Sequence, residues 1–267
     1  MSNAVSRLVV VAIGLPIVLG IAWVGGWWMF TLVLVAALVA LDELYRAGRD
    51  FRPLSLAGFV GVAACLVGVQ VGGIGWMAGG ALLTLPLAFL FVVFADTRQR
   101  ATISLAFTLL GVVWIGMGLA HLMLVRAIPD NGRLAIFTIL IAVFAADTGA
   151  YLVGRLVGRH KLAPTLSPGK SWEGFVGGFV AGIFATWVSL YKTGFADGWQ
   201  SLVLGVTIVI AAAIGDLMQS LVKRDVGIKD SGRLLAGHGG VWDRIDSLLI
   251  AVPTAYYVLA AFGEVDL

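Results

Sequence analysis

The chain has 267 residues, of which 60% are hydrophobic and only 12% are charged. Soluble domains carry about 25% charged residues, so this composition excludes a soluble globular protein, which would need a polar surface. The formal net charge is +3, and in so apolar a chain we interpret the cations as a membrane signal and expect no nucleic acid as a partner. The single cysteine, Cys65, excludes an intrachain disulfide and a multi-cysteine metal site.

Apolar runs of about 20 residues, the length that crosses a bilayer, recur along the whole chain. We predict an all-α, polytopic integral membrane protein. Its nine spans are expected at about residues 6–24, 27–46, 54–72, 75–95, 102–125, 134–154, 174–192, 200–222 and 247–263. The first run is interpreted as a helix and not as a signal peptide, because no clear cleavage site follows it. Within one integral membrane unit, residues 1–133 are expected to be scaffold helices and residues 134–267 the catalytic region.

With nine spans, 15 of the 18 Lys and Arg residues fall on one side of the membrane and only Arg126, Arg133 and Lys192 on the other. Because short cytoplasmic loops are enriched in Lys and Arg, we expect the N-terminus and the polar segments 155–173 and 223–246 in the cytoplasm. The predicted location is the bacterial inner membrane. A wrong number of spans would move loops to the other side of the membrane and lose the 15:3 division of Lys and Arg, so this division also favours nine spans.

An acid lies well inside the sixth predicted span, in the stretch FAADTGAY. Asp147 is costly at that depth, and such a residue marks a functional site by default. The alternative is a helix-packing motif in which Gly149 and Ala150 allow close approach. That alternative explains the small residues but not the acid.

The stretch APTLSPGKSWEGFVGG contains a GKS triplet, but Pro164 stands where a P-loop needs its first glycine, so we reject a P-loop. We predict a turn at SPG and then Lys170, Ser171 and Glu173 at the start of the seventh helix. Free N–H groups at a helix N-terminus, together with Lys170, would suit a phosphate. In the alternative interpretation, Ser171 is a helix cap and Lys170 an interfacial anchor.

The eighth predicted span carries Asp216, Ser220 and Lys223 at positions i, i+4 and i+7, which lie on one helical face. Lys223 and Arg224 could be membrane anchors that extend to the interface. Anchoring does not explain Asp216, a second acid within an apolar span.

The stretch GHGGVWDRID places Asp243 and Asp246 at i and i+3, on one face if the segment is helical. Carboxylates without thiolates and with few histidines favour Mg²⁺, which takes few protein ligands and shares phosphate oxygens. The nearby glycines allow the backbone close to a ligand. His238 is open to three roles: phosphate donor, base or structural hydrogen-bonder. Together, acids, cations and glycines on one membrane face indicate phosphoryl or nucleotidyl transfer.

Residues 220–246, SLVKRDVGIKDSGRLLAGHGGVWDRID, resemble the C-terminal signature of the phosphatidate cytidylyltransferase family, and SPGKSWEG and ADTGAY also look like it. The matching positions are Ser220, Lys223, Arg224, Lys229, Asp230, Gly232, His238, Gly239, Gly240, Asp243, Arg244 and Asp246. Ala236 departs from the family pattern, which has proline there, so the loop loses a fixed φ but no side-chain chemistry.

The resemblance implies the reaction of CTP with phosphatidate to give CDP-diacylglycerol and pyrophosphate in a membrane lipid environment. It also implies Mg²⁺, a second, monovalent cation such as K⁺, nine helices and a homodimer. The expected catalytic residues are Asp216, Lys223, Arg224, Lys229, Asp243 and Asp246, with Asp216, Asp243 and Asp246 as the metal ligands. The expected substrate-binding residues are Asp147, Lys170, Ser171, Glu173, Ser220, Asp230, Arg233, His238, Gly239, Gly240 and Arg244.

Two alternatives stay open at this point. Another CTP-dependent lipid enzyme, such as a polyprenol kinase, would transfer the γ-phosphoryl group and release CDP. A transporter of phosphorylated metabolites could use Asp147 and Asp216 as coupling sites, but the sequence lacks an obvious inverted repeat and its charge lies on one side.

Overall fold

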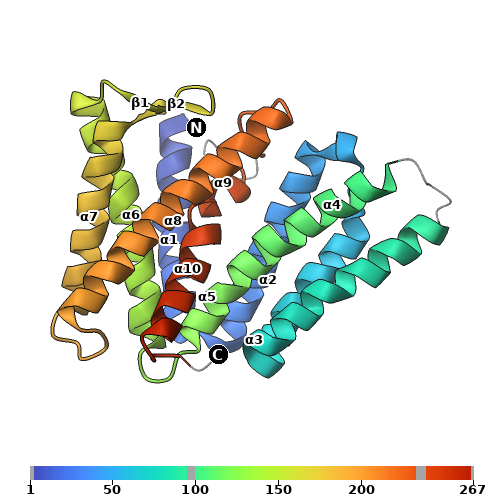
Figure 1. The fold of residues 1–267 in the computed structure, drawn as a ribbon, viewed down its shortest axis with the longest axis horizontal. Coiled ribbons are helices and arrows are strands. Elements are labelled where there is room, and N and C mark those ends of the chain that lie inside the picture. The colour runs from blue at the N-terminus through green and yellow to red at the C-terminus, as the bar shows by residue number, and fades with distance from the viewer. Residues whose placement is uncertain (1–2, 95–99, 233–238, 266–267) are drawn as a thin grey trace. The chain divides into compact units, whose positions relative to one another are not determined.

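A computed structural model describes residues 3–94, 100–232 and 239–265. The chain divides into two compact units, and Figure 1 labels the helices and strands that form them. Unit 1 comprises residues 1–127 and 226–245, and unit 2 comprises residues 128–225 and 246–267. The predicted division at residue 133 separates scaffold helices from a catalytic region, and it stays a prediction. The boundaries of the two compact units differ from this division, because residues 226–245 group with the N-terminal half of the chain.

Unit 1 is built from helices. They are α1 (Asn3–Val24), α2 (Gly26–Ala47), η1 (Arg49–Phe51), α3 (Ser55–Phe94), α4 (Ala101–Gly111), η2 (Val112–Met117), α5 (Gly118–Arg126) and α9 (Trp242–Ile245). The span Ala101–Arg126 is continuous, with a π-helical turn, η2, in its middle. The Arg126 side chain donates hydrogen bonds to the carbonyls of Ala22, Trp23 and Val24, which are the last carbonyls of α1. Arg126 therefore satisfies acceptors that a helix end leaves open.

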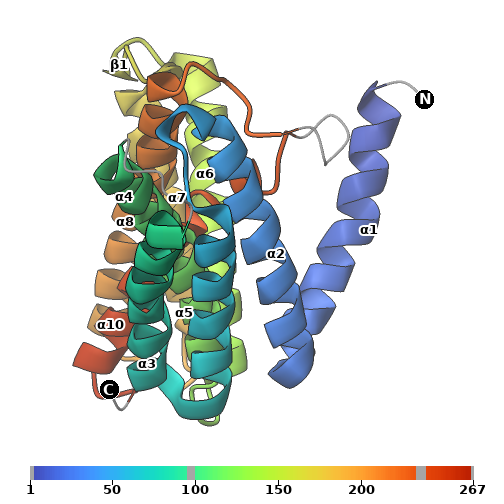
Figure 2. The same cartoon turned by 90° about the vertical axis from the view of Figure 1, so that its right-hand side faces the viewer.

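Helix α3 is a hairpin of two helical limbs. Its 40 residues would extend ~60 Å as one helix, about twice the hydrocarbon thickness of a bilayer. The helix breaks at Gly72 and Gly73, and Gly73 has a φ of 69° that favours glycine. The limbs pack closely, because a Cβ at Gly68 would lie 2.5 Å from the carbonyl oxygen of Trp76. Figure 2 shows the limbs side by side. They correspond to the predicted spans 54–72 and 75–95.

Seven helices in the described ranges are long and apolar enough to cross a membrane, with α3 counted once. Large apolar side chains are strongly exposed on them, including Phe94 at 83% and Leu156 at 80%. Such a surface is unfavourable in water and fits lipid. The chain is therefore a polytopic, predominantly α-helical membrane protein, as predicted, and the exact count of nine spans stays a prediction.

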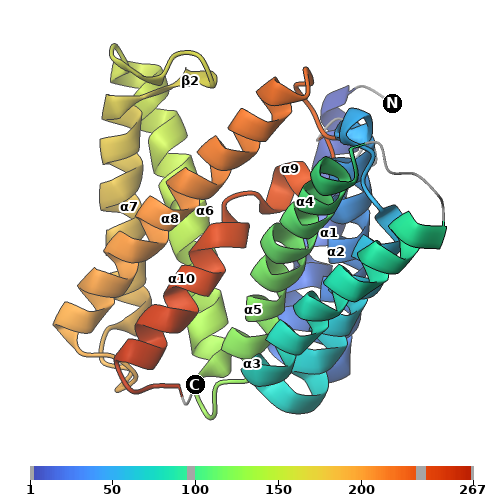
Figure 3. The same cartoon turned by 45° about the vertical axis from the view of Figure 1, so that its right-hand side comes forward.

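Unit 2 contains α6 (Gly132–Val157), β1 (Lys161–Ala163), β2 (Ser167–Ser171), α7 (Trp172–Leu190), α8 (Gly198–Asp225) and α10 (Leu248–Ala261). Helices α6 and α7 lie side by side (Figure 3). A Cβ at Gly178 would lie 2.5 Å from the carbonyl oxygen of Ala146, and a Cβ at Gly149 would lie 2.8 Å from Ala181 Cβ. Small residues thus allow the close helix contact on which packing in a membrane depends.

The predicted turn at SPG is wrong. Ser167, Pro168 and Gly169 lie in strand β2, which pairs antiparallel with β1, and the turn is formed by residues 164–166. Two effects favour the strand: the residue before a proline prefers an extended backbone, and an edge strand tolerates proline.

Candidate active site

Three carboxylates gather in unit 2. Asp147 lies in α6, Asp216 in α8, and Asp246 in the turn between α9 and α10. They are close enough for their negative charges to repel one another. Both acids that the sequence singled out inside apolar spans therefore belong to one cluster, which also includes Asp246.

Two lysines bring positive charge to this acidic cluster. Lys170 Nζ, on β2, lies 2.5 Å from Asp216 Oδ2, and both side chains are a little over one-quarter exposed. The Lys170 charge also attracts Asp147, and the Lys223 charge attracts Asp246. An opposite charge nearby makes a partly buried carboxylate tolerable. The cluster is thus a mixed set of three carboxylates and two ammonium groups.

Helix α8 supplies one face of the cluster. Ser220 Oγ lies 3.5 Å from Asp216 Oδ1, a distance that fits the predicted i, i+4 face. At the end of the same helix, Arg224 Nε donates a hydrogen bond to the Leu166 carbonyl at 3.3 Å. Arg224 therefore connects α8 to the turn of the β1–β2 hairpin.

A glycine lets the turn that carries Asp246 approach α8. A Cβ at Gly215 would lie 2.6 Å from the Asp246 carbonyl oxygen, so a larger residue would force the two segments apart. The Ser247 N–H donates to Asp246 Oδ1 at 2.8 Å, which orients the carboxylate.

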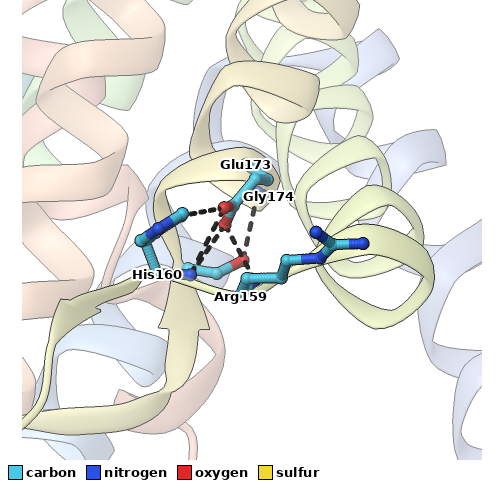
Figure 4. Close-up of polar contacts among 5 residues, drawn as sticks. Arg159, His160, Glu173 and Gly174 are labelled. Atoms are coloured by element: carbon cyan, nitrogen blue, oxygen red, sulfur yellow. Dashed lines mark hydrogen bonds and ion pairs between the residues drawn. The ribbon is translucent and has the colours of Figure 1, made fainter.

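Ser171 and Glu173 have local structural contacts. Ser171 is the N-cap of α7, and its Oγ accepts a hydrogen bond from the Gly174 N–H at 3.1 Å, as the alternative interpretation expected. Glu173 accepts from the Arg159 and His160 N–H groups and from His160 Nδ1, which lies 2.6 Å from Oε1 (Figure 4). These bonds fix the chain between α6 and β1. A substrate contact of either residue stays a prediction.

In unit 1, two carboxylates, Glu43 and Asp243, accept hydrogen bonds from described parts of the 226–245 segment. Glu43 of α2 accepts hydrogen bonds from Ser231 Oγ, the Val241 N–H and the Trp242 N–H. Asp243 Oδ2 accepts from the Ser231 N–H at 2.9 Å and from the Gly240 N–H at 3.1 Å. The structure thus shows Asp243 holding a loop together.

The glycines of this segment lie against those carboxylates. Gly239 has a φ of 79°, and a Cβ there would lie 2.7 Å from Asp243 Oδ2. A Cβ at Gly240 would collide with Glu43 Oε2 and Ser231 Oγ. The close approach predicted for Gly239 and Gly240 is therefore observed toward the protein's own side chains, and an approach to a ligand stays a prediction.

The other predicted residues of the segment are placed as follows. Lys229, Asp230 and Arg244 are exposed. Arg233, His238 and Ala236 lie outside the described residues. Helix α9 ends at Ile245, so Asp246 lies beyond it and the predicted helical face shared with Asp243 does not extend that far. Asp243 belongs to unit 1, whereas Asp216 and Asp246 belong to unit 2.

Comparison with known proteins shows the family. The model of the "Cytidylyltransferase family" matches residues 5–262. The chain belongs to the cytidylyltransferase family.

Relatives similar to this cytidylyltransferase span most of its length. A phosphatidate cytidylyltransferase of Mycobacterium bovis is 37% identical over 269 residues, covering 93% of this chain and 85% of the relative. One of Staphylococcus haemolyticus is 33% identical over 253 residues, covering 92% and 95%. One of Mycobacterium leprae is 45% identical over 131 residues, covering 49% and 42%. The chain is therefore a nucleotidyltransferase of this family.

The carboxylate oxygens of the cluster in unit 2 are ligands that suit a hard cation such as Mg²⁺. Within residues 3–94, 100–232 and 239–265, no group of three or more His, Cys, Asp and Glu side chains is arranged to hold a metal ion. Mg²⁺ commonly uses one or two carboxylates together with substrate phosphates, so Asp216 and Asp246 offer the right ligand type, and the binding of Mg²⁺ stays a prediction.

Glu43 is a residue that the sequence reasoning missed. It lies in the second predicted span and is 7% exposed. The signal was present, because an acid within an apolar span is the same feature that singled out Asp147 and Asp216.

Proposed function

We propose that this cytidylyltransferase converts CTP and phosphatidate into CDP-diacylglycerol and pyrophosphate. The observation that carries the proposal is the cluster of Asp147, Lys170, Asp216, Lys223 and Asp246 in unit 2. Carboxylates, which suit a hard metal ion, lie there beside ammonium groups, which suit phosphates, within or at the ends of apolar spans. The names of the relatives support the same substrates.

Charge repulsion is the main obstacle to this reaction. The nucleophile is a phosphate oxygen of phosphatidate, already ionised at neutral pH, so no strong general base is needed. It forms a bond to the α-phosphorus of CTP, while the bond from that phosphorus to the bridging oxygen breaks and pyrophosphate leaves. Lys170 and Lys223 neutralise part of the phosphate charge, and fixed cations of this kind need no reorganisation during the step.

We assign the metal-holding role to Asp216 and Asp246, with Asp243 as a further expected ligand. A bound Mg²⁺ would neutralise triphosphate oxygens and orient the leaving group. Lys170 pairs with Asp216, so this lysine would lie next to the phosphates of a metal–nucleotide complex held at that carboxylate. A monovalent second cation such as K⁺ stays an expectation from the family resemblance.

We infer that the cluster faces the cytoplasm of the bacterial inner membrane, where CTP is available, and that the protein is a homodimer. The orientation rests on the 15:3 division of Lys and Arg. The homodimer rests on the family resemblance alone.

The test uses purified protein in detergent with phosphatidate, Mg²⁺ and CTP labelled at either the α- or the γ-phosphate. We expect the α-label in the lipid product, the γ-label in pyrophosphate, and loss of both products when the metal is chelated. Detergent removes the sealed compartment that a transporter would need. A γ-label in the lipid would contradict the proposal and favour a lipid kinase, and the absence of pyrophosphate would exclude cytidyl transfer.

A further inference from the structure

Glu43 is a buried carboxylate on which three donors of the 226–245 segment converge. Ser231 Oγ lies 2.9 Å from Oε2, the Trp242 nitrogen 2.9 Å from Oε2, and the Val241 nitrogen 3.0 Å from Oε1. An ionised carboxylate only accepts hydrogen bonds, so three donors match it. A carboxylate inside an apolar helix is stable only with such partners.

These bonds tie together two parts of the segment that are separated by a short stretch of sequence. Ser231 precedes residues 233–238, whereas Val241 and Trp242 follow them. The Trp242 ring is fully buried and meets Trp114 edge-on, with ring centroids 5.7 Å apart. Glu43 therefore holds both arms of the segment on a helix that is itself packed in unit 1.

Glycines leave room for this carboxylate. A Cβ at Gly232 would lie 2.8 Å from Glu43 Oε1, and one at Gly240 would collide with Oε2. Both glycines belong to the stretch that resembles the family signature. Glu43 thus fills the space that the two glycines leave open.

We propose that Glu43 is a positioning residue for cytidyl transfer. It acts through Ser231 and the backbone of Val241 and Trp242, and it holds the segment that carries Lys229 and Arg244 in one arrangement. The catalytic part of this proposal rests on the proposed function. The structural part concerns only the order of the segment and does not depend on the substrate.

The experiment compares Glu43→Gln, Glu43→Asp and the control Asp42→Asn. Glutamine keeps the size of Glu43 but replaces an acceptor oxygen with a donor group, whereas aspartate keeps the charge and shortens the reach. Asp42 is the neighbouring acid on α2, its side chain is 39% exposed, and it pairs with Arg46 at 2.8 Å. The readouts are kcat and KM for CTP, and hydrogen–deuterium exchange of the amides of residues 239–245.

We expect Glu43→Gln to lower kcat/KM at least about tenfold and to speed exchange of the Val241 or the Trp242 amide. The two N–H groups bond different oxygens of Glu43, and glutamine keeps only one of them as an acceptor. Glu43→Asp should recover part of both effects. Asp42→Asn should stay within about twofold of the unmodified protein in kcat/KM and leave the exchange of these amides unchanged.

A folded Glu43→Gln protein with unchanged kcat/KM and unchanged exchange would overturn the proposal. If that variant does not fold, Glu43→Asp decides, since it keeps the charge and shortens the reach to the three donors; unchanged kcat/KM and unchanged exchange at Val241 and Trp242 would then reject the proposal. Hydrogen–deuterium exchange of these amides is measured without any enzymatic reaction. Faster exchange in variants of a protein that makes no CDP-diacylglycerol would therefore reject the proposed function and retain the structural role of Glu43.

Discussion

Lys170 Nζ lies 2.5 Å from Asp216 Oδ2, and this ion pair joins the β1–β2 hairpin to helix α8. The two residues are 46 positions apart, and the hairpin lies next to the N-terminus of α7. Removing one partner of a partly buried ion pair leaves the other charge uncompensated, which costs more than the pair itself contributes. The pair therefore links the local fold of the hairpin to the charge balance of the acidic cluster.

Replacing Lys170 should weaken CTP binding. We expect Lys170→Met to raise KM for CTP and to lower kcat/KM at least about tenfold, which corresponds to about 1.4 kcal/mol. Lys170→Arg should retain more activity because it keeps the charge. Lys192→Met, on an exposed residue between α7 and α8, is the matched control. Steady-state kinetics with varied CTP would refute this role if Lys170→Met stayed within twofold of the unmodified protein.

Asp246 should be essential for turnover. We expect Asp246→Asn to lower kcat by more than about 100-fold, since a carboxylate expected to hold the metal is lost. The variant should still be extracted from membranes and elute from gel filtration like the unmodified protein. Asp197→Asn makes the same chemical change at an exposed loop position. Near-normal product formation by Asp246→Asn would remove Asp246 from the site.

Gly178 should limit how α6 and α7 pack. In Gly178→Ala the added methyl group would lie 2.5 Å from the Ala146 carbonyl oxygen and 2.9 Å from Ala150 Cβ. We expect a loss of about 1–3 kcal/mol in stability, seen as a lower Tm in detergent. Gly79→Ala, at a helical glycine with open space around it, is the control. Equal Tm values for the two variants would show that the contact relaxes without cost.

The predicted orientation can be tested with single cysteines in a Cys65→Ala background. An impermeant thiol reagent should label Asp130→Cys and Thr193→Cys in intact cells. It should label Asp50→Cys and Lys161→Cys only after the membrane is opened, because the cation distribution places these positions in the cytoplasm. All four native residues are exposed. Labelling of positions 130 and 193 from opposite sides would contradict the pair of spans predicted between them.

Features set by local sequence were the most predictable. The apolar runs located the helices within a few residues, and the glycines at 72–73 marked the break between the limbs of α3. Asp147 and Asp216 could be singled out because an acid inside an apolar span is unusual by itself. The prediction that Asp216 and Ser220 lie on one face of their helix likewise required only helical geometry.

Features that depend on distant contacts were missed. Glu43 meets Val241 across 198 positions, and no periodicity in either segment indicates the pairing. The β1–β2 hairpin was missed because three- and five-residue strands give too short a pattern beside a GKS triplet that resembles a helix start. The grouping of residues 226–245 with unit 1 follows from such contacts, so it could not be deduced from composition.

Neither unit is continuous in sequence, and this has a consequence for biosynthesis. Unit 1 lacks residues 226–245 until the ribosome has synthesised residues 128–225, the first part of unit 2, and unit 2 in turn needs residues 246–267, which follow the last part of unit 1. The usual order, in which an N-terminal domain folds before the next one is made, is therefore not available to this protein. Separately produced halves cut near residue 133 should each be incomplete, and only their co-insertion in one membrane could restore both units.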